Sequence, residues 1–169
     1  MQQTNGLLAA PALAVESDSA TATRELAAQL ADIARAGDRI ALVGPLGAGK
    51  TQFAKGFARG LGVREVVNSP SFTLMAEYAG RLPLFHQDLY RLAGAEEVLA
   101  GGLLDERQED GVTLTEWADR LPAAIDPDRL TVRFEVTAEE RRRISLEPGS
   151  PEHARYVEAA RAWAAGVHR

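Results

Sequence analysis

The sequence predicts an α/β fold of three layers, with helices packed on a mixed, mostly parallel central sheet. A short apolar run at 39–43 is followed by a glycine-rich turn and by a run at 52–61 whose apolar residues have helical spacing. Two further apolar runs, 72–78 and 82–86, are separated by only three residues. Such a short connection predicts an antiparallel hairpin, so we expect the sheet to be mixed. With 169 residues and 46% apolar side chains, the chain is long enough for one domain with a packed core.

The amino-terminal part is expected to contribute an edge strand and a helix. Residues 1–16 are predicted as a flexible start that carries a possible strand at 12–15. The Ser-Asp-Ser sequence at 17–19 offers N-caps for the helix, and Gly37 is expected to end it. The apolar face of this helix consists of Leu26, Leu30 and Ile33.

The second half of the chain predicts more strands and a closing helix. The expected elements are a helix over 96–107 with a break at Gly101-Gly102, a central strand at 112–116, antiparallel strands at 130–136 and 143–147, and a helix that starts at 150–152 and buries Tyr156, Ala160, Trp163 and Val167. We expect residues 17–148 to form the main domain and residues 149–169 to pack on it as the C-terminal helix.

Composition narrows the classes of function. The chain has no cysteine, which excludes a disulfide framework and a thiolate zinc site. Its formal net charge of −5 and pI of about 5.3 argue against a domain that binds DNA or RNA unaided. The N-terminus lacks a basic region, and the apolar stretch 7–15 is short and broken by Pro11. We therefore expect neither a signal peptide nor a membrane span, and a cytoplasmic location.

One motif predicts phosphate binding. The run Gly44-Pro45-Leu46-Gly47-Ala48-Gly49-Lys50-Thr51 fits G-x-x-x-x-G-K-[ST] and lies between the strand and the helix that such a loop needs. Its glycines let successive N–H groups point at phosphate oxygens, and the helix N-terminus adds partial positive charge. Lys50 is expected to reach the β and γ phosphates, and Thr51 to ligate a magnesium ion. The predicted fold is thus of the P-loop NTPase type, with an ATPase domain over 17–148.

Two acidic residues at strand ends are candidates for the same site. Glu116 ends the apolar run 112–115, and Asp88 ends the run 84–87. In α/β proteins the ligand site lies at the carboxyl ends of parallel strands, where these carboxylates could hold magnesium. Each could instead be an ordinary solvated acid at the end of an element. The hydroxyl-rich turn 68–74 could sense the γ-phosphate as a switch segment does, or be a simple proline turn.

These segments together resemble the TsaE family, P-loop ATPases of bacterial tRNA threonylcarbamoyladenosine biosynthesis. The segments that carry the resemblance are Gly44 to Thr51, Ser69-Pro70-Ser71-Phe72-Thr73-Leu74, His86-Gln87-Asp88-Leu89-Tyr90-Arg91-Leu92 and Glu116-Trp117. Their order and approximate spacing are similar to the family's over roughly residues 17–146. Two positions depart from the family pattern, Ser71 and Gln52, each standing where threonine is common.

The resemblance implies a specific activity. It implies ATP binding with Mg²⁺, slow hydrolysis by the isolated protein, and action with the TsaB and TsaD proteins, with tRNA reached only through that complex. Hydrolysis would reset the complex between turnovers. The implied catalytic residues are Lys50, Asp88 and Glu116, and the implied metal ligands are Thr51, Glu116 and Asp88. The implied nucleotide-binding residues are Gly44, Pro45, Leu46, Gly47, Ala48, Gly49, Lys50, Thr51, Gln52 and Trp117.

Other interpretations of the sequence stay open. The chain could be a small-molecule kinase, although it has no long arginine-rich lid segment, or a nucleotide-gated binding subunit with incidental hydrolysis. His86 is expected to be a packed or hydrogen-bonded histidine rather than a base, although its place beside Asp88 leaves a catalytic or switch role open. The run 141–143 (Arg-Arg-Arg) is expected to form a solvated turn, with a role in steering tRNA or a partner as the alternative. Arg91 could contact the γ-phosphate or pair with a nearby carboxylate.

Overall fold

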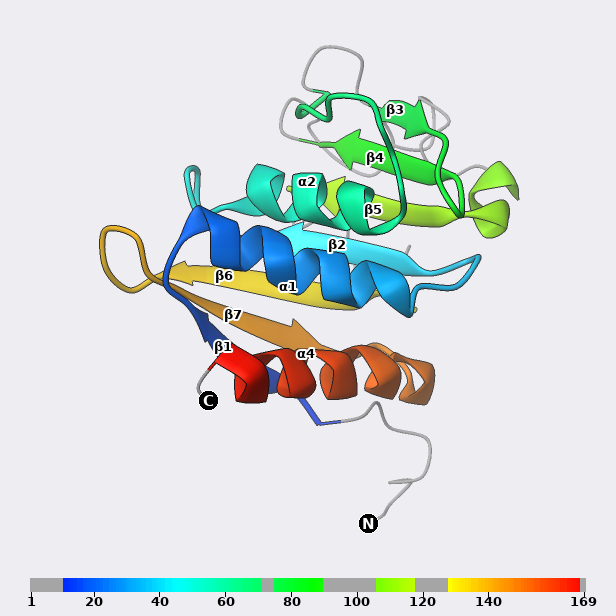
Figure 1. Cartoon of the computed structure of the whole chain (residues 1–169). Coiled ribbons are helices and arrows are strands. Elements are labelled where there is room, and N and C mark those ends of the chain that lie inside the picture. The colour runs from blue at the N-terminus through cyan, green and yellow to red at the C-terminus, as the bar shows by residue number, and fades with distance from the viewer. Residues whose placement is uncertain (1–10, 71–74, 90–105, 118–127, 168–169) are drawn as a thin grey trace.

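A computed structural model describes residues 11–70, 75–89, 106–117 and 128–167, and their centre is a seven-stranded mixed sheet (Figure 1). The strand order is β1-β7-β6-β2-β5-β4-β3. The strands are β1 (Leu13–Ser17), β2 (Arg39–Val43), β3 (Met75–Tyr78), β4 (Leu84–Asp88), β5 (Val112–Glu116), β6 (Leu130–Val136) and β7 (Arg142–Glu147). The α-helices are α1 (Ala20–Asp32), α2 (Lys50–Gly60) and α4 (Ala154–Val167), and short 3-10 turns occupy η2 (Glu106–Asp110) and η4 (Pro151–His153).

The middle of the sheet is parallel and its edges are antiparallel, which confirms the predicted mixed sheet. Strands β4, β5, β2 and β6 pair in parallel in that order. The hairpin strands β7 and β3 pair antiparallel with β6 and β4, and β1 closes the other edge against β7. The carboxyl ends of four neighbouring strands therefore meet at one edge of the sheet. The glycine-rich loop, defined here as residues 44–51, begins there at the end of β2.

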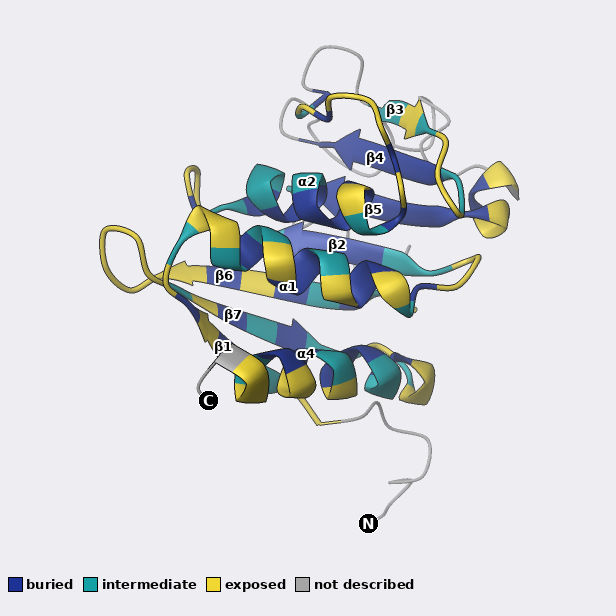
Figure 2. Cartoon of the chain, in the orientation of Figure 1, coloured by how far each residue is buried: buried dark blue, intermediate teal, exposed yellow. Residues whose placement is uncertain are grey.

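Helices α1, α2 and α4 lie side by side on the face of the sheet that Figure 1 shows. Two glycines of α2 allow its close approach to α1. A Cβ on Gly56 would lie 2.2 Å from the carbonyl oxygen of Arg24, and a Cβ on Gly60 would lie 2.5 Å from that of Ala28. Figure 2 shows the central strands as buried and the outer sides of the helices as exposed. The core lies between sheet and helices and includes the fully buried Phe53, Phe57, Phe134 and Tyr156.

A partly buried carboxylate, Asp38, joins α4 to the turn before β2. Asp38 accepts hydrogen bonds from Arg155 Nη2 at 2.6 Å and from the Tyr156 hydroxyl. Burial raises the pKa of Asp38, but the bonds from Arg155, Tyr156 and the Arg35 amide outweigh burial and hold this pKa below its ordinary value. Arg155 also donates to the carbonyl of Ile33 at 2.8 Å. The C-terminal helix is thus fixed to the strand that leads into the glycine-rich loop.

Most expected elements are confirmed, with corrections at their ends. The predicted edge strand is β1, and the Ser19 side chain caps α1 by accepting from the Ala22 amide at 3.0 Å. Gly37 was expected to end that helix, which in fact ends five residues earlier, because Ile33 leaves helical geometry. Gly37 instead serves the next turn at φ +93°.

Further differences concern the later elements. The first strand of the predicted hairpin begins at Met75, and residues 72–74 lie outside the described residues. The same holds for most of the helix predicted over 96–107 and for the side chain of Val167. The last helix opens with the 3-10 turn η4 before α4 begins at Ala154. None of the helices that the structure describes has the length and hydropathy that a bilayer span requires.

Candidate functional site

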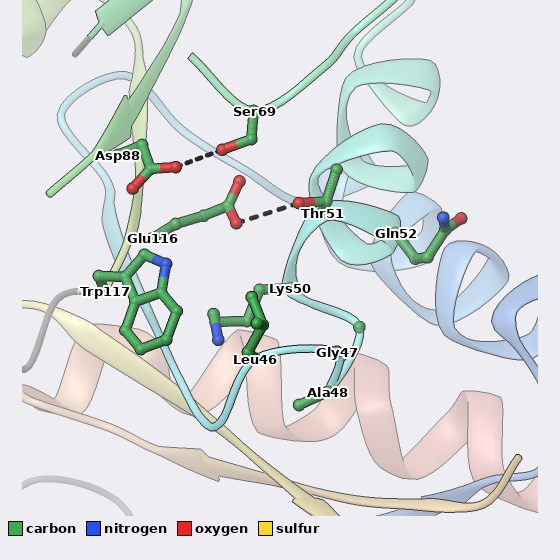
Figure 3. A pocket seen from close by; sticks show the side chains of 11 residues that line it. Leu46, Gly47, Ala48, Lys50, Thr51, Gln52, Ser69, Asp88, Glu116 and Trp117 are labelled. Carbon is green, nitrogen blue, oxygen red and sulfur yellow. Dashed lines mark hydrogen bonds between the residues drawn. The ribbon is translucent and has the colours of Figure 1, made fainter. Parts of the chain in front are cut away.

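The predicted site residues converge on one cavity at the carboxyl ends of β2, β4 and β5 (Figure 3). Its volume is about 580 Å³. The lining residues are Leu46, Gly47, Ala48, Gly49, Lys50, Thr51, Gln52, Ser69, Asp88, Glu116 and Trp117. All but Ser69 were predicted as site residues. The predicted Gly44 and Pro45 do not line the cavity and contribute main-chain carbonyls to its lysine instead.

The shape of the glycine-rich loop depends on its glycines. Gly47 and Gly49 have φ values of +79° and +106°, which side chains with a Cβ rarely adopt. At Gly44 the reason is space, because a Cβ would lie 2.9 Å from the carbonyl oxygen of Phe134 on β6. Gly49 then caps α2 without a side-chain hydrogen bond. The first amides of α2 therefore stand at the cavity with no intrahelical acceptor, as at other anion-binding helix termini.

Lys50 belongs to the glycine-rich loop and is only 5% exposed. Its ammonium donates to the carbonyl oxygens of Gly44 at 2.5 Å and Pro45 at 2.9 Å. It also stands 4.0 Å from the centroid of the Trp117 ring. Trp117 can face the lysine because its φ of +58° turns the chain sharply after β5. The lysine charge is thus held at the cavity by dipoles and an aromatic face.

Glu116 connects the loop helix with the sheet. It pairs in register with Leu42 of β2 and Asp88 of β4. Its Oε1 accepts from the Thr51 hydroxyl at 3.1 Å, and its Oε2 accepts from His86 Nε2 at 2.6 Å. His86 is fully buried, and its Nδ1 has no hydrogen-bond partner among the residues that the structure describes. The expectation of a packed, hydrogen-bonded histidine is confirmed, but its partner is the candidate metal ligand.

Asp88 is the second carboxylate of the cavity and is 3% exposed. The Ser69 hydroxyl donates to its Oδ2. The segment before Ser69 is held from the other side by Lys55 on α2, whose ammonium donates to the Val67 carbonyl at 2.5 Å and to Asn68 Oδ1 at 3.2 Å. The start of the predicted switch turn therefore lies at the cavity. Its remainder at 71–74 is outside the described residues, as is Arg91.

The donor set of this cavity matches what magnesium requires. The oxygen donors that line it are the hydroxyls of Thr51 and Ser69 and the carboxylates of Asp88 and Glu116, and Thr51, Asp88 and Glu116 are the predicted ligands. No group of three or more His, Cys, Asp or Glu side chains with metal-binding geometry occurs within the described part of the chain. Magnesium in nucleotide sites is typically held by one or two carboxylates together with phosphate oxygens and water. The residues present fit such an ion.

Two side chains beside the loop have partners that the sequence did not predict. Gln52 was predicted to bind nucleotide, and its side chain points away from Glu116 and accepts from Arg24 of α1 at 2.6 Å (Figure 3). Arg142 was expected in a solvated turn. It instead opens β7, and its guanidinium donates to the carbonyls of Gly47 at 3.2 Å and Ala48 at 3.1 Å. A contact across more than ninety residues leaves no signal in the local sequence. The run of three arginines therefore predicted a solvent-exposed turn and gave no indication of this contact.

A second cavity of about 180 Å³ lies beside the first and shares part of the loop with it. Its lining residues are Ser19, Ala20, Thr23, Gly47, Gly49, Gln52, Glu139, Glu140 and Arg142. It therefore joins the N-terminus of α1 to the turn between β6 and β7. Gln52 lines both cavities, so its predicted role in nucleotide binding stays a prediction.

Comparisons with known proteins agree on one family. Residues 17–144 match the family model described as threonylcarbamoyl adenosine biosynthesis protein TsaE. The tRNA threonylcarbamoyladenosine biosynthesis protein TsaE of Bacillus subtilis is 42% identical over 125 residues, which cover 73% of this chain and 78% of that protein. Its counterpart from Treponema pallidum is 41% identical over 110 residues, or 65% of this chain and 82% of the relative.

A solved structure supports the same assignment. The crystal structure of YdiB from Bacillus subtilis superposes with a TM-score of 0.67 at 34% sequence identity, covering 90% of this chain and 94% of the other. The family model spans well over half of the chain and includes the glycine-rich loop, Asp88, Glu116 and Trp117. The chain therefore belongs to the TsaE family of tRNA threonylcarbamoyladenosine biosynthesis.

Proposed function

We propose that this protein is a magnesium-dependent ATPase that acts with TsaB and TsaD when threonylcarbamoyl is placed on the adenosine beside the tRNA anticodon. In this proposal hydrolysis resets the complex between turnovers and does not form the carbamoyl bond. One observation carries the proposal: the lysine, hydroxyl and carboxylates of three separate segments face one cavity. Membership of the TsaE family supplies the biosynthetic context.

Phosphate binding would be the task of the loop and of Lys50. The amides at the start of α2 and the left-handed glycines Gly47 and Gly49 supply N–H groups on the cavity side of the chain. Lys50 is already at the cavity, and its partners include two carbonyls and an indole ring. A phosphate oxygen is a stronger acceptor for an ammonium than a carbonyl is. The lysine would therefore exchange at least one carbonyl for phosphate when ATP binds.

Thr51, Glu116 and Asp88 would hold the magnesium ion. When bound, the ion would neutralise charge that develops on the phosphate oxygens during hydrolysis. His86 fixes one oxygen of Glu116, so this carboxylate has a set orientation before any ligand arrives. Asp88 lies beside it in register and would also orient the attacking water.

The lining of the cavity supports slow hydrolysis by the isolated chain. Among the residues that the structure describes, none that lines the cavity is an arginine. An arginine supplied to the γ-phosphate by another protein raises the rate of comparable hydrolases by about 10³–10⁵. We therefore expect TsaB together with TsaD to raise the rate of ATP hydrolysis by this protein.

The first experiment tests nucleotide binding. Calorimetry with ADP and Mg²⁺ should show binding by the protein and its loss in Lys50→Ala. The control variant is Arg59→Ala, which removes one positive charge from an exposed position of the same helix and should bind normally. Undiminished ADP binding by Lys50→Ala would refute the role of the loop.

The second experiment tests the reaction. In a mixture of this protein, TsaB, TsaD, the enzyme that supplies the threonylcarbamoyl group, tRNA and ATP, phosphate release and modified tRNA are followed together. We expect Glu116→Ala and Asp88→Ala to stop modification after the first turnover. Continued modification with Glu116→Ala would favour a passive nucleotide-gated subunit. Transfer of the γ-phosphate to a small hydroxyl compound would favour a kinase.

A further inference from the structure

Arg142 connects the phosphate-binding loop to a turn far away in the sequence. It follows the turn 137–141, in which the amides of Thr137 and Ala138 donate to the carbonyl of Arg141 at 3.1 and 3.4 Å. The guanidinium of Arg142 is half-buried and donates only to main-chain carbonyls in the contacts that define its position. Its acceptors are Gly47 at 3.2 Å, Ala48 at 3.1 Å, Ala138 at 3.1 Å, Glu139 at 3.1 Å and Arg141 at 2.9 Å.

The two sides of the guanidinium have different tasks. Nη1 makes all three bonds to the turn, whereas Nε and Nη2 hold the loop. Only a planar fork with several donors can bridge the two segments in this way. A lysine at this position would keep the charge but would have a single ammonium, which cannot span both sets of carbonyls. The turn and the loop are therefore coupled through one side chain.

The bonds to Gly47 and Ala48 also set the direction of the loop amides. In a trans peptide the carbonyl and the following N–H point in opposite directions. When Arg142 Nε binds the Ala48 carbonyl, the N–H of Gly49 must face away from the arginine. Gly49 is the residue immediately before Lys50, at the position where such loops present amides to phosphate. The arginine thus fixes the orientation of the Gly49 amide through the opposite side of the same peptide. Its positive charge also favours an anion at the loop.

We infer that Arg142 is a positioning residue for the phosphate-binding loop: it presets the loop amides for phosphate and makes the turn 137–141 a place from which phosphate affinity can be changed. This inference rests on the proposed nucleotide binding. It assigns to Arg142 no contact with the nucleotide itself. With Arg142 in place, the loop already has the conformation that binds phosphate. Without Arg142, part of the binding free energy would be spent on ordering the loop, so the affinity for phosphate falls.

The test compares three variants with two probes. Arg142→Gln removes the charge and the fork, and Arg142→Lys keeps the charge and removes the fork. Arg143→Gln is the matched control, since Arg143 is the next residue and its partner is the exposed Glu16 at 3.1 Å. The probes are ADP with Mg²⁺ and inorganic tripolyphosphate with Mg²⁺, measured by calorimetry. Thermal unfolding of each variant is recorded in parallel.

We expect both Arg142 variants to lose about tenfold in affinity for ADP, and a similar factor for tripolyphosphate, while Arg143→Gln stays within twofold. An equal loss for both probes marks the phosphate cradle, because tripolyphosphate has no base or sugar. Full affinity in Arg142→Lys would show that charge alone matters and would overturn the inference. A loss confined to ADP would place Arg142 at the base or sugar and would also overturn it. Failure of the unchanged protein to bind ADP would instead refute the proposed function.

Discussion

At the scale of single residues, Lys50 and Trp117 form a pair that the proposed nucleotide binding would rearrange. The lysine ammonium faces the indole ring at 4.0 Å, and the indole belongs to a residue with a left-handed backbone. Such a conformation costs about 1 kcal/mol or more outside glycine and is concentrated at functional sites. The position of Trp117 thus serves the cavity rather than the stability of the fold.

A fluorescence titration can follow that rearrangement. Mg²⁺ with ADP should change the emission of Trp117, because phosphate draws the ammonium away from the indole. Trp117→Phe should abolish the change and keep the affinity within roughly fivefold, since phenylalanine still offers an aromatic face. Trp163→Phe is the control, because Trp163 is buried in the core and its emission should not change when nucleotide is added. If Trp117→Phe showed the same change in emission as the unchanged protein, Trp117 would not be its source, and this account would be wrong.

The sequence predicts the candidate site residues far better than their contacts. Lys50, Thr51, Asp88 and Glu116 could be found because a motif or the end of an apolar run marks each of them. The bond between His86 and Glu116 depends on the register of β4 against β5, which hydrophobic periodicity does not define. Arg142 was missed for the same kind of reason: its acceptors lie on a loop more than ninety residues away.

At the scale of elements, the contact between α1 and α2 depends on two glycines that the sequence does not mark as special. A Cβ on Gly56 would overlap the backbone of Arg24, which cannot move without shifting α1. We expect Gly56→Ala to lower the free energy of unfolding by about 3 kcal/mol, despite the better helix propensity of alanine. The control is Gly166→Ala in α4, where the new methyl group meets open space and should stabilise by about 0.5–1 kcal/mol. Chemical denaturation of both variants measures the difference, and equal stabilities would disprove the close packing.

The start of α4 should make stability depend on pH. His153 is buried, and its Nδ1 accepts from the Gly149 amide at 3.0 Å, which requires an unprotonated nitrogen. Burial lowers the pKa of His153 and outweighs the opposing effects of Asp128 and Asp38. Because the pKa is lower in the folded than in the unfolded protein, the unfolded chain binds protons first as pH falls below about 6.5.

The stability contributed by neutral His153 is therefore complete above pH 6.5 and is lost as pH falls through the folded-state pKa. Denaturation midpoints between pH 7.5 and pH 5 should decrease, and His153→Asn should decrease less because asparagine can accept the same amide without titrating. If the denaturation midpoints of the unchanged protein and of His153→Asn fell equally with pH, groups other than His153 would cause the pH dependence.

At the scale of the whole molecule, the net negative charge disfavours direct binding of tRNA by the isolated chain. With a formal net charge of −5, the chain lacks the excess of cations that drives binding to phosphate backbones. The isolated protein should retain neither tRNA nor DNA in a gel-shift assay at about 0.15 M salt. TsaB and TsaD together should bring it into a complex with tRNA. Direct retention of tRNA by the isolated chain would show a basic surface that composition does not reveal.

The class of fold could be predicted because its signals are local. Apolar runs, glycine turns and one hairpin identify most of the strands, and their parallel core follows from the loop motif. The order in which β6 and β7 continue the sheet beyond β2 was not predictable, because it depends on which buried faces meet in three dimensions. The end of α1 before Gly37 shows the same limit on a smaller scale, since the turn there is set by Asp38 and by its partners on α4.

The order of the strands has a consequence for synthesis on the ribosome. Strand β1 precedes the other described strands in the chain, yet its neighbour among them in the sheet is β7, and the paired Glu16 and Arg143 are 127 residues apart in the sequence. Strand β2 likewise waits for β5 and β6. At about 5–20 residues per second, the nascent chain keeps its first strands unpaired for most of its synthesis. During that time the backbone donors of β1 and β2 are open to chaperones and to other nascent chains, so translation speed over 112–147 should influence how much of the protein folds.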